Sequence, residues 1–300
     1  MDSPASAHAA RQRLDGVALA SGLLAPVTWG MTGVFIRLLH GLPTLYIVMA
    51  RLGVAALVLL PWALRSRRGI AEAMRSPLAA PMGAYYLFAT EAFVRAPVVE
   101  VTLLVSSAPV VAVGLDAIRG ARPLRQQVIG AVVAVLGLIL FLRPGSRITH
   151  DQALGYAFAL CAAVASAAYA VGLRARAQAR RPLDPLVLTV MACVLGALAS
   201  GLLVAFGAPM PATPGFAASP WPYLALLGCI STAVPTLAFG LASARLPAVL
   251  TTSLGLLTPL FAALFAGVLL REWPAPAAIP GALVAIAGVV LLLRAPARAG

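Results

Sequence analysis

The stretch AFVRAPVVEVTLLVSSAPVVA, residues 92–112, returns 150 residues later as ASARLPAVLTTSLGLLTPLFA, residues 242–262. Eight of the 21 paired positions are identical. Each copy has the pattern of the end of one apolar span, a turn at Arg-x-Pro, and a second span with a proline in its middle. A second echo, G-x3-A-x2-G, occurs at residues 130–137 and 281–288. The chain is therefore predicted to consist of two copies of one unit.

Composition excludes a soluble protein with one covered core. Hydrophobic residues make up 61% of the 300 residues and charged residues only 10%, whereas soluble domains average about 25% charged residues. Each apolar run is long enough to cross about 30 Å of hydrocarbon as a helix, and lipid offers backbone groups no partners outside a helix or a closed barrel. The predicted fold is an all-α integral membrane protein with ten transmembrane helices, at about 16–36, 43–64, 77–95, 97–118, 126–143, 154–174, 185–206, 221–244, 247–270 and 277–294.

The basic residues indicate a lipid partner. The net charge is +13, and all 22 basic residues are arginine. They gather in short linkers between apolar runs, which suits anionic lipid at a membrane surface better than the phosphates of a nucleic acid. The three cysteines lie inside apolar runs with no metal-binding spacing. We therefore expect a lipid bilayer as partner, no nucleic acid, no metal and no cofactor.

The distribution of arginine predicts the orientation of the chain. With a cytoplasmic N-terminus, 16 arginines fall in inner segments and 5 in outer ones, so both termini are predicted to be cytoplasmic. Five spans per copy is an odd number, so the second copy, 153–295, enters the membrane upside down relative to the first, 14–145. The linker at 65–76 carries four arginines while its counterpart at 207–220 carries none. Such an inverted repeat predicts a site near mid-depth, where the halves meet, and alternating access by rocking about it.

A family resemblance rests on WGMTGVFIR (29–37), MARLGVAALVLLP (49–61), residues 231–273 and PGALVAIAGVVLLLR (280–294). These segments resemble the drug/metabolite transporter superfamily in its EamA branch, and most closely its bacterial amino-acid exporters. The resemblance implies an exporter of amino acids, aromatic ones included, in the bacterial inner membrane. Exporters of other metabolites or drugs share the scaffold and remain the alternative.

Phosphorylated solutes rank low, because Arg51 is the one clearly intramembrane cation and phosphates demand more. A membrane-embedded enzyme ranks lowest, because no HExxH motif, mid-membrane carboxylate pair or Ser/His couple is found. We predict a monomeric transporter that is not an enzyme, and leave a dimer open. The G-x3-A-x2-G pattern is typical of close helix packing, either between the two halves or at a dimer face.

Polar and aromatic residues at mid-depth are the candidates for binding a small amphipathic solute. Ordinary packing between helices is the competing interpretation for each of them. They are Thr28, Trp29, Tyr85, Tyr86, Ser106, Ser107, Ser166, Tyr169, Thr232, Thr236, Ser253 and Thr258.

Prolines and charges form two further sets of candidates. Pro26, Pro109, Pro235 and Pro259 fall inside spans, where a proline frees a carbonyl and permits a kink. Each is predicted to act as a hinge or cavity-lining break, or else as a static kink. Charges within a membrane are functional candidates by default, so Arg51, Glu91 and Glu100 are candidates for charge coupling. Glu91 and Arg95 are four residues apart, so a local ion pair at the outer surface is the alternative.

Overall fold

The computed structural model describes residues 4–120, 122–142, 148–179, 183–207, 219–243 and 254–294. Regular structure in these residues is helical throughout, and no strand occurs among them. Eight helical stretches are long and apolar enough to cross a membrane: Gly16–Leu38, Thr44–Ala63, Val98–Ile118, Arg125–Leu142, His150–Leu173, Pro185–Phe206, Trp221–Ala242 and Pro276–Leu293. The chain is therefore an all-helical, multi-pass membrane protein.

The two other predicted spans correspond to shorter helices. The run at 77–95 forms α5 (Ala79–Arg95), which has 17 residues. The run at 247–270 contains the apolar helix Thr258–Leu270, and residues 244–253 before it lie outside the described part of the chain. Ten spans thus remain a prediction, of which the described residues show eight.

Several spans are built from more than one helix, and the linker at 65–76 contains a short helix, α4. The elements are α1 (Pro4–Gly30), α2 (Thr32–Leu38), α3 (Thr44–Ala63), α4 (Arg67–Met74), α6 (Val98–Val105), α7 (Ala108–Ile118), α8 (Arg125–Leu142), α9 (His150–Gln178), α10 (Pro185–Phe206), α11 (Trp221–Gly228), the π-helix η1 (Cys229–Ala233), α12 (Val234–Ser243), α14 (Thr258–Phe265), the π-helix η2 (Ala266–Leu270), the 3-10 helix η3 (Pro276–Ala278) and α15 (Ile279–Leu293).

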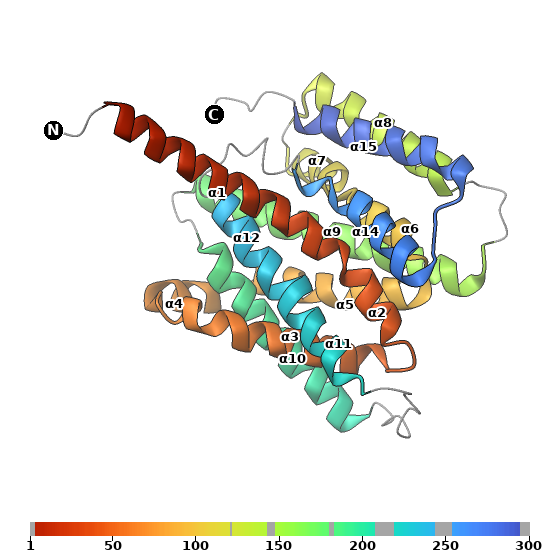
Figure 1. Cartoon of the computed structure of the whole chain (residues 1–300), viewed down its shortest axis with the longest axis horizontal. Coiled ribbons are helices and arrows are strands. Elements are labelled where there is room, and N and C mark those ends of the chain that lie inside the picture. The colour runs from red at the N-terminus through yellow and green to blue at the C-terminus, as the bar shows by residue number, and fades with distance from the viewer. Residues whose placement is uncertain are drawn as a thin grey trace.

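Most of these helices pack side by side in a closed circuit. In order, α5 packs against α9, α9 against α6 and α7, α6 against α14, and α14 against α1. The circuit continues from α1 to α12 and η1, from η1 to α3, from α3 to α10, and from α10 back to α5. The pair α8 and α15 lies outside this circuit and packs against α7 (Figure 1). Large apolar side chains such as Leu57, 72% exposed, and Phe206, 86% exposed, point outward, as contact with lipid requires.

The contacts between helices follow the sequence repeat, because the larger contacts have counterparts between the corresponding helices of the other copy. The packing of α5 on α9 has its counterpart in α12 on α1, and the packing of α10 on α5 has its counterpart in α3 on α11 and η1. Each pair becomes the other when every helix is replaced by its equivalent in the other copy. The two copies therefore contact each other through equivalent helices.

The pair α8 and α15 shows the exchange at atomic detail. The helices run antiparallel, with Gly137 against Ala285 and Gly288 against Ala134, and the repeat makes these two contacts equivalents of each other. A Cβ atom on Gly137 would lie 2.5 Å from the Cα of Ala285, and one on Gly288 would lie 2.6 Å from the Cα of Ala134. The helices therefore touch backbone to backbone, which only glycine permits. The G-x3-A-x2-G pattern joins the two halves of one chain.

Candidate functional site

Arg51 of α3 is the most enclosed charged residue in the described chain, with 2% of its surface exposed. It lies seven residues, about 10 Å, from the N-terminal end of α3 and so within the hydrocarbon depth. Its Nε donates to Thr232 Oγ1 at 2.8 Å, and its Nη1 to Thr90 Oγ1 at 3.4 Å. The guanidinium carbon sits 5.0 Å from the ring centroid of Tyr86. Side chains from α3, α5 and η1 thus meet at one cation.

The two threonines are oriented by their own helices. The hydroxyl of Thr90 donates its proton to the carbonyl of Tyr86 at 2.7 Å, and that of Thr232 donates to the carbonyl of Leu227 at 3.1 Å. With its single proton used, each hydroxyl presents lone pairs to the arginine. Both threonines therefore serve as neutral acceptors that hold the guanidinium without cancelling its charge.

A π-helical turn brings Thr232 into reach. Pro235 has no N–H, so the carbonyl of Ser231 loses its usual partner four residues on. The helix widens over Cys229–Ala233 into a π-helix, a local change found often at functional sites. Gly228 permits the close approach to α3, because a Cβ atom there would lie 2.9 Å from the carbonyl oxygen of Arg51.

Arg51 keeps unused hydrogen-bonding capacity. No carboxylate of the described residues forms an ion pair with it, and its Nη2 donates to none of their acceptors. The hydroxyl of Ser231, the neighbour of Thr232 in the sequence, is fully enclosed and has no hydrogen-bond partner among the described residues. An unneutralised cation at membrane depth is costly and marks a functional site.

Aromatic rings lie beside this cluster and along the neighbouring helices. The rings of Tyr85 and Tyr86 meet edge to face at 5.2 Å, and Trp29 lies 5.4 Å from Phe239 between α1 and α12. The sequence reading missed Thr90 and Phe239. Helical spacing carried the signal for both, because Thr90 follows Tyr86 by four residues and Phe239 follows Thr232 by seven, which places each on the same face.

The remaining candidates are dispersed rather than gathered at Arg51. The hydroxyls of Thr28, Ser106, Ser107, Thr236 and Thr258 all donate to backbone carbonyls three or four residues back along the chain. The side chain of Tyr169, on α9, hydrogen-bonds that of Thr189 on α10, and Ser166 is half-buried on α9. Ser253 lies outside the described residues.

Pro109 and Pro259 do not sit inside continuous helices, as the sequence suggested, but open new ones. Each occupies the first turn of its helix, α7 or α14, where a missing N–H costs little. In the first copy Val110 N bonds to Ser107 O at 2.8 Å, and in the second Leu260 N bonds to Leu257 O at 3.0 Å. The same break thus occurs twice, at positions that the repeat makes equivalent. Pro26 and Pro235, by contrast, are buried within α1 and α12.

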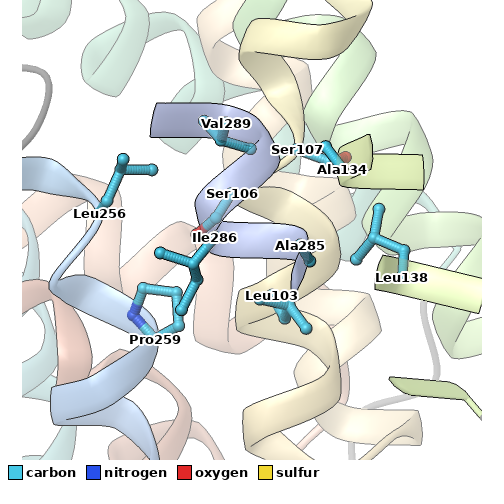
Figure 2. Close-up of a pocket in the computed structure, with 10 residues that line it drawn as sticks. All are labelled: Leu103, Ser106, Ser107, Ala134, Leu138, Leu256, Pro259, Ala285, Ile286 and Val289. Carbon is cyan, nitrogen blue, oxygen red and sulfur yellow. The ribbon is translucent and has the colours of Figure 1, made fainter. Parts of the chain in front are cut away.

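Both breaks border one small pocket beside the crossing of α8 and α15 (Figure 2). The surface that lines it is apolar, because the hydroxyls of Ser106 and Ser107 donate to carbonyls of α6. The free volume is about 10 Å³, which is no more than one water molecule requires. The lining residues are Leu103, Ser106, Ser107, Ala134, Leu138, Leu256, Pro259, Ala285, Ile286 and Val289. A second, wholly apolar pocket of about 150 Å³ adjoins it and is bordered by Leu260 and Leu283, both more than half exposed.

The other candidate charges form one local ion pair and several contacts between the two halves of the chain, away from Arg51. Arg95 pairs with Glu91 at 2.5 Å and with Asp151 at 2.6 Å, and the hydroxyl of Tyr156 donates to Glu100. Glu272 accepts from the backbone N–H of Val98 at 2.7 Å. All of these contacts lie at one end of the bundle, where α5 ends and α6 and α9 begin. The alternative of a local Glu91–Arg95 pair is the one that the structure shows.

The family model of the EamA-like transporter family matches residues 16–143 and 153–294, one match for each copy. No curated protein matches the chain. A solved structure described as "Crystal structure of protein" is similar in fold, with a TM-score of 0.62 and 20% sequence identity over 91% of this chain and 95% of the other. Within the described residues no group of three or more His, Cys, Asp or Glu side chains is placed to hold a metal ion.

Proposed function

Because the chain belongs to the EamA-like transporter family, and is thus a membrane transporter of small molecules, we propose that it exports amino acids, with a broad range that includes aromatic ones. The observation that carries this proposal is the mid-span cluster of one buried arginine, two hydroxyls and tyrosine rings. A cation and aromatic surfaces suit a solute that has a carboxylate at one end and an apolar side chain at the other.

The proposed mechanism is alternating access between two inverted five-helix repeats. Antiparallel packing of α8 on α15, with equivalent residues exchanged, supports a two-fold axis perpendicular to those helices. For helices that cross the membrane, such an axis lies in the membrane plane. The solute path runs within the circuit of packed helices, and the halves rock about it. The paired breaks before Pro109 and Pro259 are the proposed hinges. Each proline lacks the backbone N–H that a continuous helix would need at that position, so the break persists.

The cellular setting is part of the same proposal. The protein works as a monomer in a bacterial inner membrane, with both termini in the cytoplasm and the inner linkers rich in arginine. The inter-repeat contacts of Glu100 and Glu272 lie at the end of the bundle that this topology places outside.

Counterflow into proteoliposomes tests the function. Vesicles loaded with unlabelled amino acids are diluted into each labelled amino acid in turn, and exchange above that of empty vesicles is measured. Exchange of phenylalanine, tyrosine, tryptophan and several aliphatic amino acids is the expected result. Lack of exchange for all twenty, together with exchange of a neutral drug-like solute, would transfer the assignment to the drug exporters of the superfamily.

A further inference from the structure

We infer that Arg51 is the residue that binds the carboxylate of the transported solute, so that this transporter selects monocarboxylates with an apolar or aromatic remainder. The inference rests on the proposed transport function and names its substrate class. It predicts that an amino acid and the corresponding carboxylic acid are recognised, whereas the decarboxylated amine is not.

The first argument is the hydrogen-bonding capacity of the guanidinium. Arginine carries five N–H donors, of which one at Nε and one at Nη1 are used on Thr232 and Thr90. Nη2 has no acceptor among the described residues. Together with the second proton of Nη1 it leaves the end of the fork free, which is the edge that pairs with both oxygens of a carboxylate.

The second argument is charge. Three carboxylates of the described residues are engaged by other groups: Glu91 and Asp151 by Arg95, and Glu100 by Tyr156. The partners of Arg51 are neutral hydroxyls and an aromatic face. An arginine held by neutral groups in a low-dielectric interior retains its full attraction for an anion. A single cation balances a monocarboxylate, whereas a phosphate dianion would be left half-neutralised.

The third argument is orientation. The ring of Tyr86 lies against the guanidinium group at 5.0 Å, which is a cation–π contact. Thr232 reaches the guanidinium at Nε and Thr90 at Nη1. Three contacts from two neighbouring elements fix the group before any solute arrives, so little conformational entropy is lost on binding.

A purely structural role for Arg51 as a brace between α3, α5 and η1 makes different predictions. A brace would affect the melting temperature and the maximal rate for every solute alike. A carboxylate ligand would affect the KM, and only for solutes that carry a carboxylate. The test therefore compares solutes as well as variants.

Three solutes that share one ring separate the two roles: phenylalanine, 3-phenylpropionate and phenethylamine. Each is tested on the full-length protein as a competitor of labelled phenylalanine counterflow and, independently of transport, as a ligand that raises the melting temperature in detergent. We expect competition and stabilisation from phenylalanine and phenylpropionate, and neither from phenethylamine at tenfold higher concentration. Equal effects of phenethylamine and phenylpropionate would overturn the inference.

Variants sharpen this result. Arg51→Gln should raise the KM for phenylalanine at least tenfold and abolish stabilisation by phenylpropionate, while Arg51→Lys, which keeps the charge, should retain part of both. The matched control is Arg119→Gln, which changes an exposed arginine at the end of α7 and should behave as wild type. If Arg51→Gln does not fold, the lysine variant and the solute series on the wild-type protein still decide the matter.

The outcomes also separate this inference from the proposed function. Stabilisation by phenylpropionate without any amino-acid exchange would refute the proposed exporter but uphold the carboxylate site. Amino-acid exchange with an unchanged KM in Arg51→Gln would refute the carboxylate site but uphold the exporter.

Discussion

Gly137→Ala adds one methyl group at the point where the two halves of the chain touch. That Cβ would lie 2.5 Å from the Cα of Ala285 and 2.7 Å from the carbonyl carbon of Val284. Both neighbours are backbone atoms, so no side-chain rotation can relieve the overlap. An ordinary contact begins near 3.4 Å, and the backbone nitrogen of Ala285 lies closer still to that Cβ than its Cα does, so α8 and α15 would have to separate by more than about 0.9 Å at this crossing.

The expected loss of stability follows from two opposing effects. Overpacking of a well-packed contact costs about 1–3 kcal/mol, and separation also weakens the dispersion contacts along the helix pair. Replacement of glycine by alanine inside a helix returns roughly 0.5–1 kcal/mol. The net destabilisation should be about 1–2 kcal/mol, which lowers the Tm of a protein of this size by roughly 2–6 °C.

Tryptophan fluorescence during a thermal ramp in detergent measures the shift, since the chain contains 4 tryptophans. Gly114→Ala is the matched control, because Gly114 also lies within a helix, α7, and a Cβ atom there meets nothing within 4 Å. The control should be as stable as wild type or slightly more so. If Gly137→Ala melts at or above the temperature of Gly114→Ala, the backbone-to-backbone contact described for α8 and α15 is wrong. By the repeat, Gly288→Ala should lower the Tm by a similar amount.

Three further predictions address the breaks, the polar contacts and the threading. Pro109→Ala or Pro259→Ala permits a continuous helix and should slow counterflow severalfold without lowering the Tm; an unchanged rate in both would remove the hinge role. Glu272→Gln replaces the charge-assisted hydrogen bond from the backbone N–H of Val98, at 2.7 Å, by a neutral one. The free energy of unfolding should fall by about 1 kcal/mol, which lowers the Tm by roughly 2–4 °C. An unchanged Tm would mean that solvent screens this contact. Single cysteines in 65–76 and in 207–220, on a cysteine-free background, should react with an impermeant maleimide from opposite sides of the membrane, and labelling from one side would disprove the inverted repeat.

The sequence by itself determined which segments of the chain form helices. An apolar run of about 20 residues has one stable structure in lipid, a helix whose backbone groups hydrogen-bond to each other. For this reason the predicted spans at 43–64, 126–143 and 185–206 agree with the structure to within one residue at each end. The repeat of glycines at 130–137 and 281–288 identified two surfaces built for close approach. It could not say whether those surfaces meet each other or another molecule, because periodicity describes one helix face and not its partner.

Tertiary structure alone decided which polar residues act together. Arg51 and Thr232 are 181 residues apart, and no local pattern links them; the π-turn ahead of Pro235 and the close approach at Gly228 bring them within hydrogen-bonding distance. The same holds for the candidates that do not contact Arg51. A serine or threonine hydroxyl at mid-span can donate to a carbonyl of its own helix or to a group on a neighbouring helix. The sequence does not distinguish these two arrangements. Packing makes that choice, since the orientation of each helix face is set by the contacts of the whole bundle rather than by the residues of one span.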